Sequence, residues 1–94
     1  MQYTNEDIVE DEIYYNKTPY GKEFLDKAGH NNINTKCFVD ISGSRFCFGS
    51  ITTTINLTHC RLATLEERNW VIACEQAGKF IPLNEVKSET YEIY

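Results

Sequence analysis

Apolar and polar positions form their clearest pattern between residues 60 and 78, where they predict a helix. Four apolar residues recur at helical spacing and share one face: Trp70, Ala73, Cys74 and Ala77. Thr64 can cap the free N–H groups of the first turn, and Glu67, three residues later, completes a capping box. Gly78 can adopt the left-handed conformation that ends a helix. We therefore expect one main helix within residues 64–78.

Between residues 36 and 62 the apolar period changes to two, which predicts β-strands. Two alternating segments flank Ser42-Gly43-Ser44, a pattern typical of a hairpin over residues 36–51 with a three-residue turn. Centring the turn on Gly43 places Val39 opposite Cys47. One strand face then holds Cys37, Val39, Ile41, Cys47 and Ile51, and the other holds Phe38, Phe46 and Phe48. Thr52 through Leu62 is rich in β-branched residues and predicts a third strand.

The first 29 residues are interpreted as an acidic helical segment, with an exposed acidic strand or tail as the alternative for residues 6–12. Thr4, with Asp7 three residues later, is a plausible helix start. Thr18-Pro19 is a second start, since proline fits the first helical position. A helix from there would place Tyr20, Phe24 and Ala28, which are spaced by four, on one face. It would end at Gly29.

The predicted fold class is α+β, in one domain over residues 1–94. A small antiparallel β-meander of about three to four strands (36–62) packs against the main helix (64–78). The remaining segment, residues 79–94, is predicted to be extended: Pro82 suits a sheet edge, and Thr90 to Tyr94 alternate in strand fashion.

The net charge of −5 is concentrated at the N-terminal end. Residues 1–26 hold seven acidic and two basic residues, whereas residues 27–94 hold seven of each. Such an acidic end favours a basic protein partner and makes direct nucleic-acid binding unlikely. The candidate partner-binding residues are Glu6, Asp7, Glu10, Asp11 and Glu12. No apolar run is long enough for a signal peptide or membrane helix, so a cytoplasmic protein without membrane contact is expected.

No catalytic residue, metal site or cofactor is expected. The four cysteines are spaced by ten, thirteen and fourteen residues, unlike the tight first pair of a zinc site, and are interpreted as free core thiols. A nucleophilic pair of His59 with Cys47 or Cys74 stays open as an alternative. So does a zinc cluster of Cys37, Cys47, Cys60 and His59.

One stretch of the chain resembles a module of small prophage-encoded proteins. It begins with Cys60-Arg61-Leu62-Ala63-Thr64-Leu65-Glu66-Glu67, runs through Trp70 and continues to Ala77-Gly78-Lys79-Phe80. In that module a strand ending in Arg-hydrophobic-Ala-Thr is followed by Pro-Glu-Glu and a helix. Leu65 stands here where the module usually has proline. The resemblance covers about a fifth to a quarter of the chain. It implies a phage context and no catalytic residue.

Small acidic prophage proteins are often counter-defence factors, among them anti-CRISPR proteins. By that analogy, the first functional hypothesis is a non-enzymatic inhibitor whose acidic face occupies a basic nucleic-acid-binding surface of a host defence nuclease, such as an RNA-targeting (type VI) CRISPR nuclease. The second is an immunity- or antitoxin-like partner of a basic toxin. The third is a small RNA-binding accessory protein that uses Arg45, Phe46 and Phe48.

Overall fold

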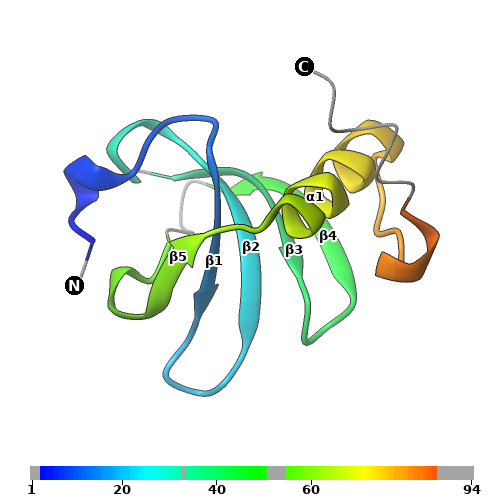
Figure 1. The fold of residues 1–94 in the computed structure, drawn as a ribbon, viewed down its shortest axis with the longest axis horizontal. Coiled ribbons are helices and arrows are strands. Elements are labelled where there is room, and N and C mark those ends of the chain that lie inside the picture. Colours follow the sequence, from blue (N-terminus) through cyan, green and yellow to red (C-terminus); the bar gives the residue numbers. More distant parts are fainter. Residues whose placement is uncertain (1–2, 33, 51–54, 87–94) are drawn as a thin grey trace.

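A five-stranded antiparallel sheet forms the centre of the computed structural model, which describes residues 3–32, 34–50 and 55–86 (Figure 1). The strands are β1 (Ile13–Lys17), β2 (Glu23–Ala28), β3 (Thr35–Asp40), β4 (Arg45–Ser50) and β5 (Cys60–Leu62). Their spatial order is β4-β3-β2-β1-β5. One helix, α1 (Leu65–Ala77), packs against the sheet, and the predicted α+β class is confirmed, with more strands than expected.

The predicted limits of α1 are confirmed by its two caps. Thr64 Oγ1 accepts a hydrogen bond from the Glu67 N–H at 3.2 Å, and Glu67 Oε1 accepts one from the Thr64 N–H at 2.8 Å. At the other end, Gly78 has a φ of 71°, and its N–H donates to the Cys74 carbonyl. Both ends are therefore set by short-range contacts that the sequence displays.

The main core lies between α1 and one face of the sheet. It contains Ile13, Leu25, Cys37, Val39, Trp70, Val71 and Cys74. Trp70 also donates from Nε1 to the Ile81 carbonyl at 2.6 Å, which attaches the segment after the helix. The predicted helix face was wrong in two places, because Val71 is fully buried and Ala77 is exposed.

The hairpin of β3 and β4 is confirmed, but its predicted register was wrong by one residue. Val39 pairs with Phe46, and Phe38 pairs with Cys47, because the turn has four residues rather than three. The Asp40 carboxylate accepts a hydrogen bond from the Gly43 N–H at 2.9 Å within this turn. Since directly paired residues share a face, Phe46 lies with Val39 on the α1 side.

The prediction of a helical segment over residues 1–29 was wrong. Within residues 3–29, which the structure describes, only Asn5–Asp7 is helical, as a single 3₁₀ turn, and β1 and β2 form a hairpin. Thr18 to Gly21 make the connecting turn, where Gly21 has a φ of 88°. Both β1 and β2 lie inside the sheet with buried residues on both faces, so neither shows the simple alternation that reveals a strand.

The third strand of the predicted meander was also placed wrongly. Within the described part of residues 52–62, only Cys60–Leu62 is a strand, preceded by a 3₁₀ turn at Leu57–His59. Strand β5 pairs with β1, at the opposite edge of the sheet from β4. After the helix, Pro82 precedes a 3₁₀ turn at Leu83–Glu85 rather than joining a strand, and the predicted strand in the tail lies outside the described residues.

Candidate functional site

The acidic candidates lie on the segment that leads into β1 (Figure 1). We call Glu6, Asp7, Glu10, Asp11 and Glu12 the acidic surface. Asp11 anchors this segment, because its N–H donates to the Ala28 carbonyl at the end of β2, at 2.9 Å. Its backbone is left-handed, with a φ of 72°, a conformation that Asp and Asn tolerate better than most residues. The backbone of the acidic surface is thus tied to the sheet.

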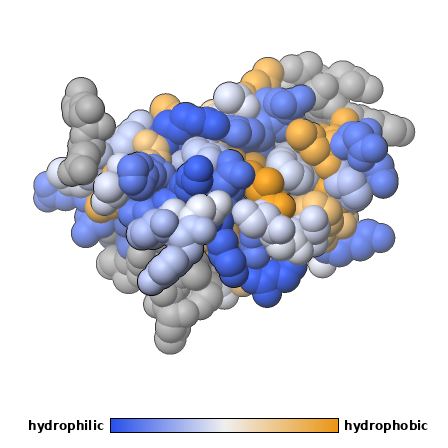
Figure 2. Space-filling view, turned by 90° about the horizontal axis from the view of Figure 1, so that it is seen from below, coloured by the Kyte–Doolittle hydropathy of each residue, from blue (hydrophilic) through white to orange (hydrophobic). Residues whose placement is uncertain are grey.

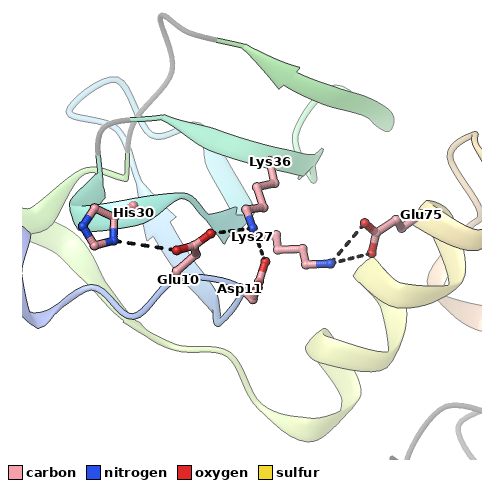
Figure 3. Close-up of polar contacts among 6 residues, drawn as sticks. All are labelled: Glu10, Asp11, Lys27, His30, Lys36 and Glu75. Atoms are coloured by element: carbon pink, nitrogen blue, oxygen red, sulfur yellow. Dashed lines mark hydrogen bonds and ion pairs between the residues drawn. The ribbon is translucent and has the colours of Figure 1, made fainter.

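Lys36 on β3 neutralises part of this surface (Figure 3). Its Nζ lies 2.9 Å from Glu10 Oε2 and 2.6 Å from Asp11 Oδ1. The hydrogen bond from Lys36 lowers the pKa of Asp11, and the two carboxylates in turn raise the pKa of Lys36. His30 Nδ1 lies 3.7 Å from Glu10 Oε1, which adds a contact whose strength depends on protonation of the imidazole.

The other carboxylates of the acidic surface are used differently. Glu12 Oε1 accepts a hydrogen bond from Arg68 of α1 at 2.6 Å, which ties the segment to the helix. Asp7 accepts from the Thr4 N–H at 2.8 Å and caps its own 3₁₀ turn. Glu6 is exposed and makes no ion pair among the described residues. Among the described residues, these five carboxylates face two permanent cations, Lys36 and Arg68, which leaves an excess of three negative charges.

The pair of Lys27 and Glu75 lies beside this network in Figure 3. Lys27 Nζ is 3.1 Å from each carboxylate oxygen of Glu75, so it joins β2 to α1. Lys27 also exerts a weaker attraction on the charged form of Asp11. The acidic surface thus continues into a mixed network of acids and bases rather than into a uniformly negative face.

Of the three residues proposed for base stacking, Phe46 and Phe48 come together, but Arg45 does not join them. Phe46 and Phe48 lie edge to face, with ring centroids 5.0 Å apart, on the side of the sheet that α1 covers. Arg45 directly precedes Phe46 in β4, and neighbouring strand residues lie on opposite faces. Its guanidinium is bound to the Asp40 carboxylate at 3.1 Å. Phe46 packs against the core, whereas Phe48 is 59% exposed.

No group of three or more possible metal ligands gathers anywhere in the described ranges. Cys37 and Cys74 are buried in the main core, while Cys47 and Cys60 are partly buried. The Cys60 thiol approaches the Leu57 carbonyl at 3.8 Å. Burial raises the pKa of Cys37 to about 12 and raises that of Cys74 as well, which disfavours the reactive thiolate at both positions.

Sequence reasoning missed a buried acid, Asp26, on the sheet face opposite α1. Only 3% of Asp26 is exposed, and its carboxylate accepts a hydrogen bond from Asn16 Nδ2 at 3.4 Å. The Asn16 amide oxygen accepts in turn from the Asn56 N–H at 3.1 Å. Burial raises the pKa of Asp26 to about 7. The segment holding Asp26 was expected to be helical, so nothing in the sequence indicated this environment.

No helix in residues 3–32, 34–50 or 55–86 is long and apolar enough to cross a membrane. Comparisons with protein-family models, with curated proteins and with solved structures find no match to this chain. The resemblance to a prophage module therefore stands on the residues around Thr64 alone.

Proposed function

We propose that this protein is a non-enzymatic inhibitor that binds a basic, nucleic-acid-binding surface of another protein through its acidic surface. The observation that carries the proposal is the excess of three negative charges on a segment anchored to the sheet. Complementary charge accelerates association and disfavours partners of the wrong sign. A basic groove that normally holds phosphates would offer the Lys and Arg side chains that such a surface attracts.

The ion pairs within the acidic surface support this proposal in a second way. Lys36 and Arg68 hold three of the carboxylates in defined positions before any partner arrives. Ordering a flexible charged side chain on binding costs about 0.5–1.5 kcal/mol, and a side chain that is already ordered avoids part of that cost. The surface is therefore less negative than the sequence suggests but better organised.

In its specific form, the proposal is a phage-type counter-defence inhibitor acting in the host cytoplasm on a defence nuclease, and an RNA-targeting (type VI) CRISPR nuclease is the first target to test. The resemblance around Thr64 supports the phage context, and the acidic surface supports the type of target. An immunity- or antitoxin-like partner of a basic toxin is the alternative, because it would use the same charge complementarity.

The direct experiment is target-RNA cleavage by a purified type VI nuclease loaded with guide RNA, after incubation with increasing amounts of this protein. We expect cleavage to fall, and Glu10→Gln combined with Asp11→Asn to weaken the effect. The matched control is Glu66→Gln with Glu85→Gln, which removes two exposed carboxylates elsewhere. Unchanged cleavage at saturating protein would contradict the anti-CRISPR form, and neutralisation of a basic toxin would then support the alternative.

A further inference from the structure

The end of the sheet opposite the acidic surface carries two adjoining hollows. They have volumes of about 400 and 480 Å³ and lie around the β1–β2 turn and β5. Lys17 and His59 line both hollows, so the two adjoin, and we call them together the depression. Figure 2 views the molecule from this side and shows mostly hydrophilic and intermediate residues on its left half, where the β1–β2 turn lies.

Two lysines at the β1–β2 turn, unlike most basic side chains of the described residues, are not paired with a carboxylate. Five cations are paired with carboxylates: Lys27, Lys36, Arg45, Arg61 and Arg68. Lys17 and Lys22, on either side of the β1–β2 turn, make no ion pair among the described residues. The Lys17 carbonyl accepts a hydrogen bond from Asn56 Nδ2 at 2.6 Å, so the backbone of this lysine is held while its ammonium group is left for a ligand.

The same depression offers flat surfaces for stacking. The Arg61 guanidinium lies 4.3 Å from the ring centroid of Tyr15 and is held by Glu67 at 2.8 and 3.1 Å. Tyr15 is itself fixed, since its hydroxyl donates to Glu23 at 2.6 Å. Tyr20 lies at the tip of the turn and is 93% exposed, although burying an aromatic ring is normally favourable.

We propose that this depression binds single-stranded nucleic acid, with a backbone phosphate at Lys17 and His59 and bases stacked on Tyr20 and on the Arg61–Tyr15 pair. Sequence-tolerant single-strand sites combine cations for the backbone with aromatic or guanidinium planes for the bases. This arrangement differs from the one predicted at Phe46 and Phe48, and it does not depend on the function proposed for the acidic surface.

The net charge of −5 does not rule this out, because the acidic surface lies at the other end of β1. Five strand residues rising about 3.3 Å each separate the two ends by roughly 16 Å. That separation is about twice the screening length of about 8 Å at physiological ionic strength. The acidic surface is therefore largely screened from a phosphate at Lys17. The carboxylates nearer to that position, Glu23 and Glu67, are bound to Tyr15 and Arg61.

The test is an amide-resolved NMR titration of the full chain with an unstructured single-stranded RNA hexamer. We expect shifts confined to residues 15–22 and 58–61. Tyr20→Ala should weaken binding at least about fivefold, because stacking of one base contributes about 1–3 kcal/mol. Lys17→Gln with His59→Gln should weaken binding further. It should also reduce the slope of log affinity against log salt concentration by about the amount that one phosphate contact contributes. Lys79→Gln, an exposed lysine on another part of the chain, is the control and should bind as the wild type does.

Three results would overturn the proposal. The first is the absence of shifts at millimolar RNA, and the second is a set of shifts outside the two segments. The third is an equal response to inorganic phosphate or to oligoglutamate at matched concentration, which would show general anion attraction without recognition of bases. Because all the substituted side chains are exposed, an unchanged melting temperature for each variant will show that a loss of binding is not a loss of folding.

Discussion

Lys36 Nζ lies 2.6 Å from Asp11 Oδ1, so a cation on β3 balances a carboxylate from the segment that precedes β1. The two residues are 25 positions apart in the chain, and only the pairing of β2 with both β1 and β3 brings them together. This contact reduces the negative charge of the acidic surface and also fixes its shape.

The first prediction concerns this pair. Removing the cation by Lys36→Gln should raise the pKa of Asp11 toward its ordinary value, because the hydrogen bond from Lys36 is the largest cause of its lowering. The melting temperature should hardly change, since exposed ion pairs add little to stability. Carboxyl titration followed by NMR measures the pKa, with Glu66→Gln as the control. An unshifted Asp11 titration would show that the contact does not persist in solution.

The second prediction concerns Asp26. Its pKa is raised from 3.8 to about 7 in the folded protein, so the folded state holds a proton that the unfolded chain releases between these values. The contribution of Asp26 to the free energy of unfolding should therefore be most favourable below about pH 4. It should fall as pH rises toward 7 and level off above pH 7. The difference between a pKa of 3.8 and one of about 7 corresponds to roughly 4 kcal/mol of stability.

Asp26→Asn removes the titrating group while keeping an oxygen that can accept from Asn16. We expect this variant to lose most of the decline in stability between pH 5 and pH 8, and to be more stable than the wild type at pH 8. Urea unfolding at several pH values measures this, with Glu66→Gln as an exposed control. A decline in the variant as steep as in the wild type would mean that Asp26 is not the group responsible.

The third prediction concerns α1 and its caps. Thr64→Ala should cost about 1 kcal/mol, because it leaves the Glu67 N–H without its acceptor. Trp70→Ala should cost about 3–5 kcal/mol, since only 8% of Trp70 is exposed and its Nε1 donor to Ile81 is lost. Leu65→Ala, at a position that is 53% exposed, is the control. Equal melting temperatures for Trp70→Ala and Leu65→Ala would contradict the packing described for the helix.

The fourth prediction concerns the cysteines. Cys37 and Cys74 should resist iodoacetamide in the native protein, because both are buried and have raised pKa values. The partly buried Cys47 and Cys60 should react first, and denaturant should expose all four. Mass spectrometry of the labelled peptides distinguishes the sites. Reductant and chelators should leave the melting temperature unchanged, and a marked drop with either would indicate a disulfide or a metal site.

The parts of the fold that were predicted correctly depend on contacts close in sequence. The ends of α1 are set by Thr64, Glu67 and Gly78, which act within a few residues of themselves. The β3–β4 hairpin was found because its strands alternate, but its register depended on the Asp40 side chain stabilising a four-residue turn. A pattern of apolar residues does not report the length of such a turn.

The parts predicted wrongly depend on distant partners. The four-residue spacing of Phe24 and Ala28 predicts a helical face, yet both belong to a strand whose neighbours, β1 and β3, pair with it from both sides. The acidic residues could be named from the sequence, but their pairing could not. Arg68 meets Glu12 from 56 residues away, and only the packing of α1 on the sheet determines that contact.

The measurement that tests the proposed function most directly is the association rate of this protein with the immobilised nuclease–guide RNA complex over a range of salt concentrations. We predict that the rate falls steeply as salt rises, because screening weakens attraction between exposed charges. Glu10→Gln with Asp11→Asn should lower the rate, Lys36→Gln should raise it, and Glu66→Gln with Glu85→Gln should change it less than the first pair does. A rate that is independent of salt, with all these variants binding alike, would contradict a role for the acidic surface in binding.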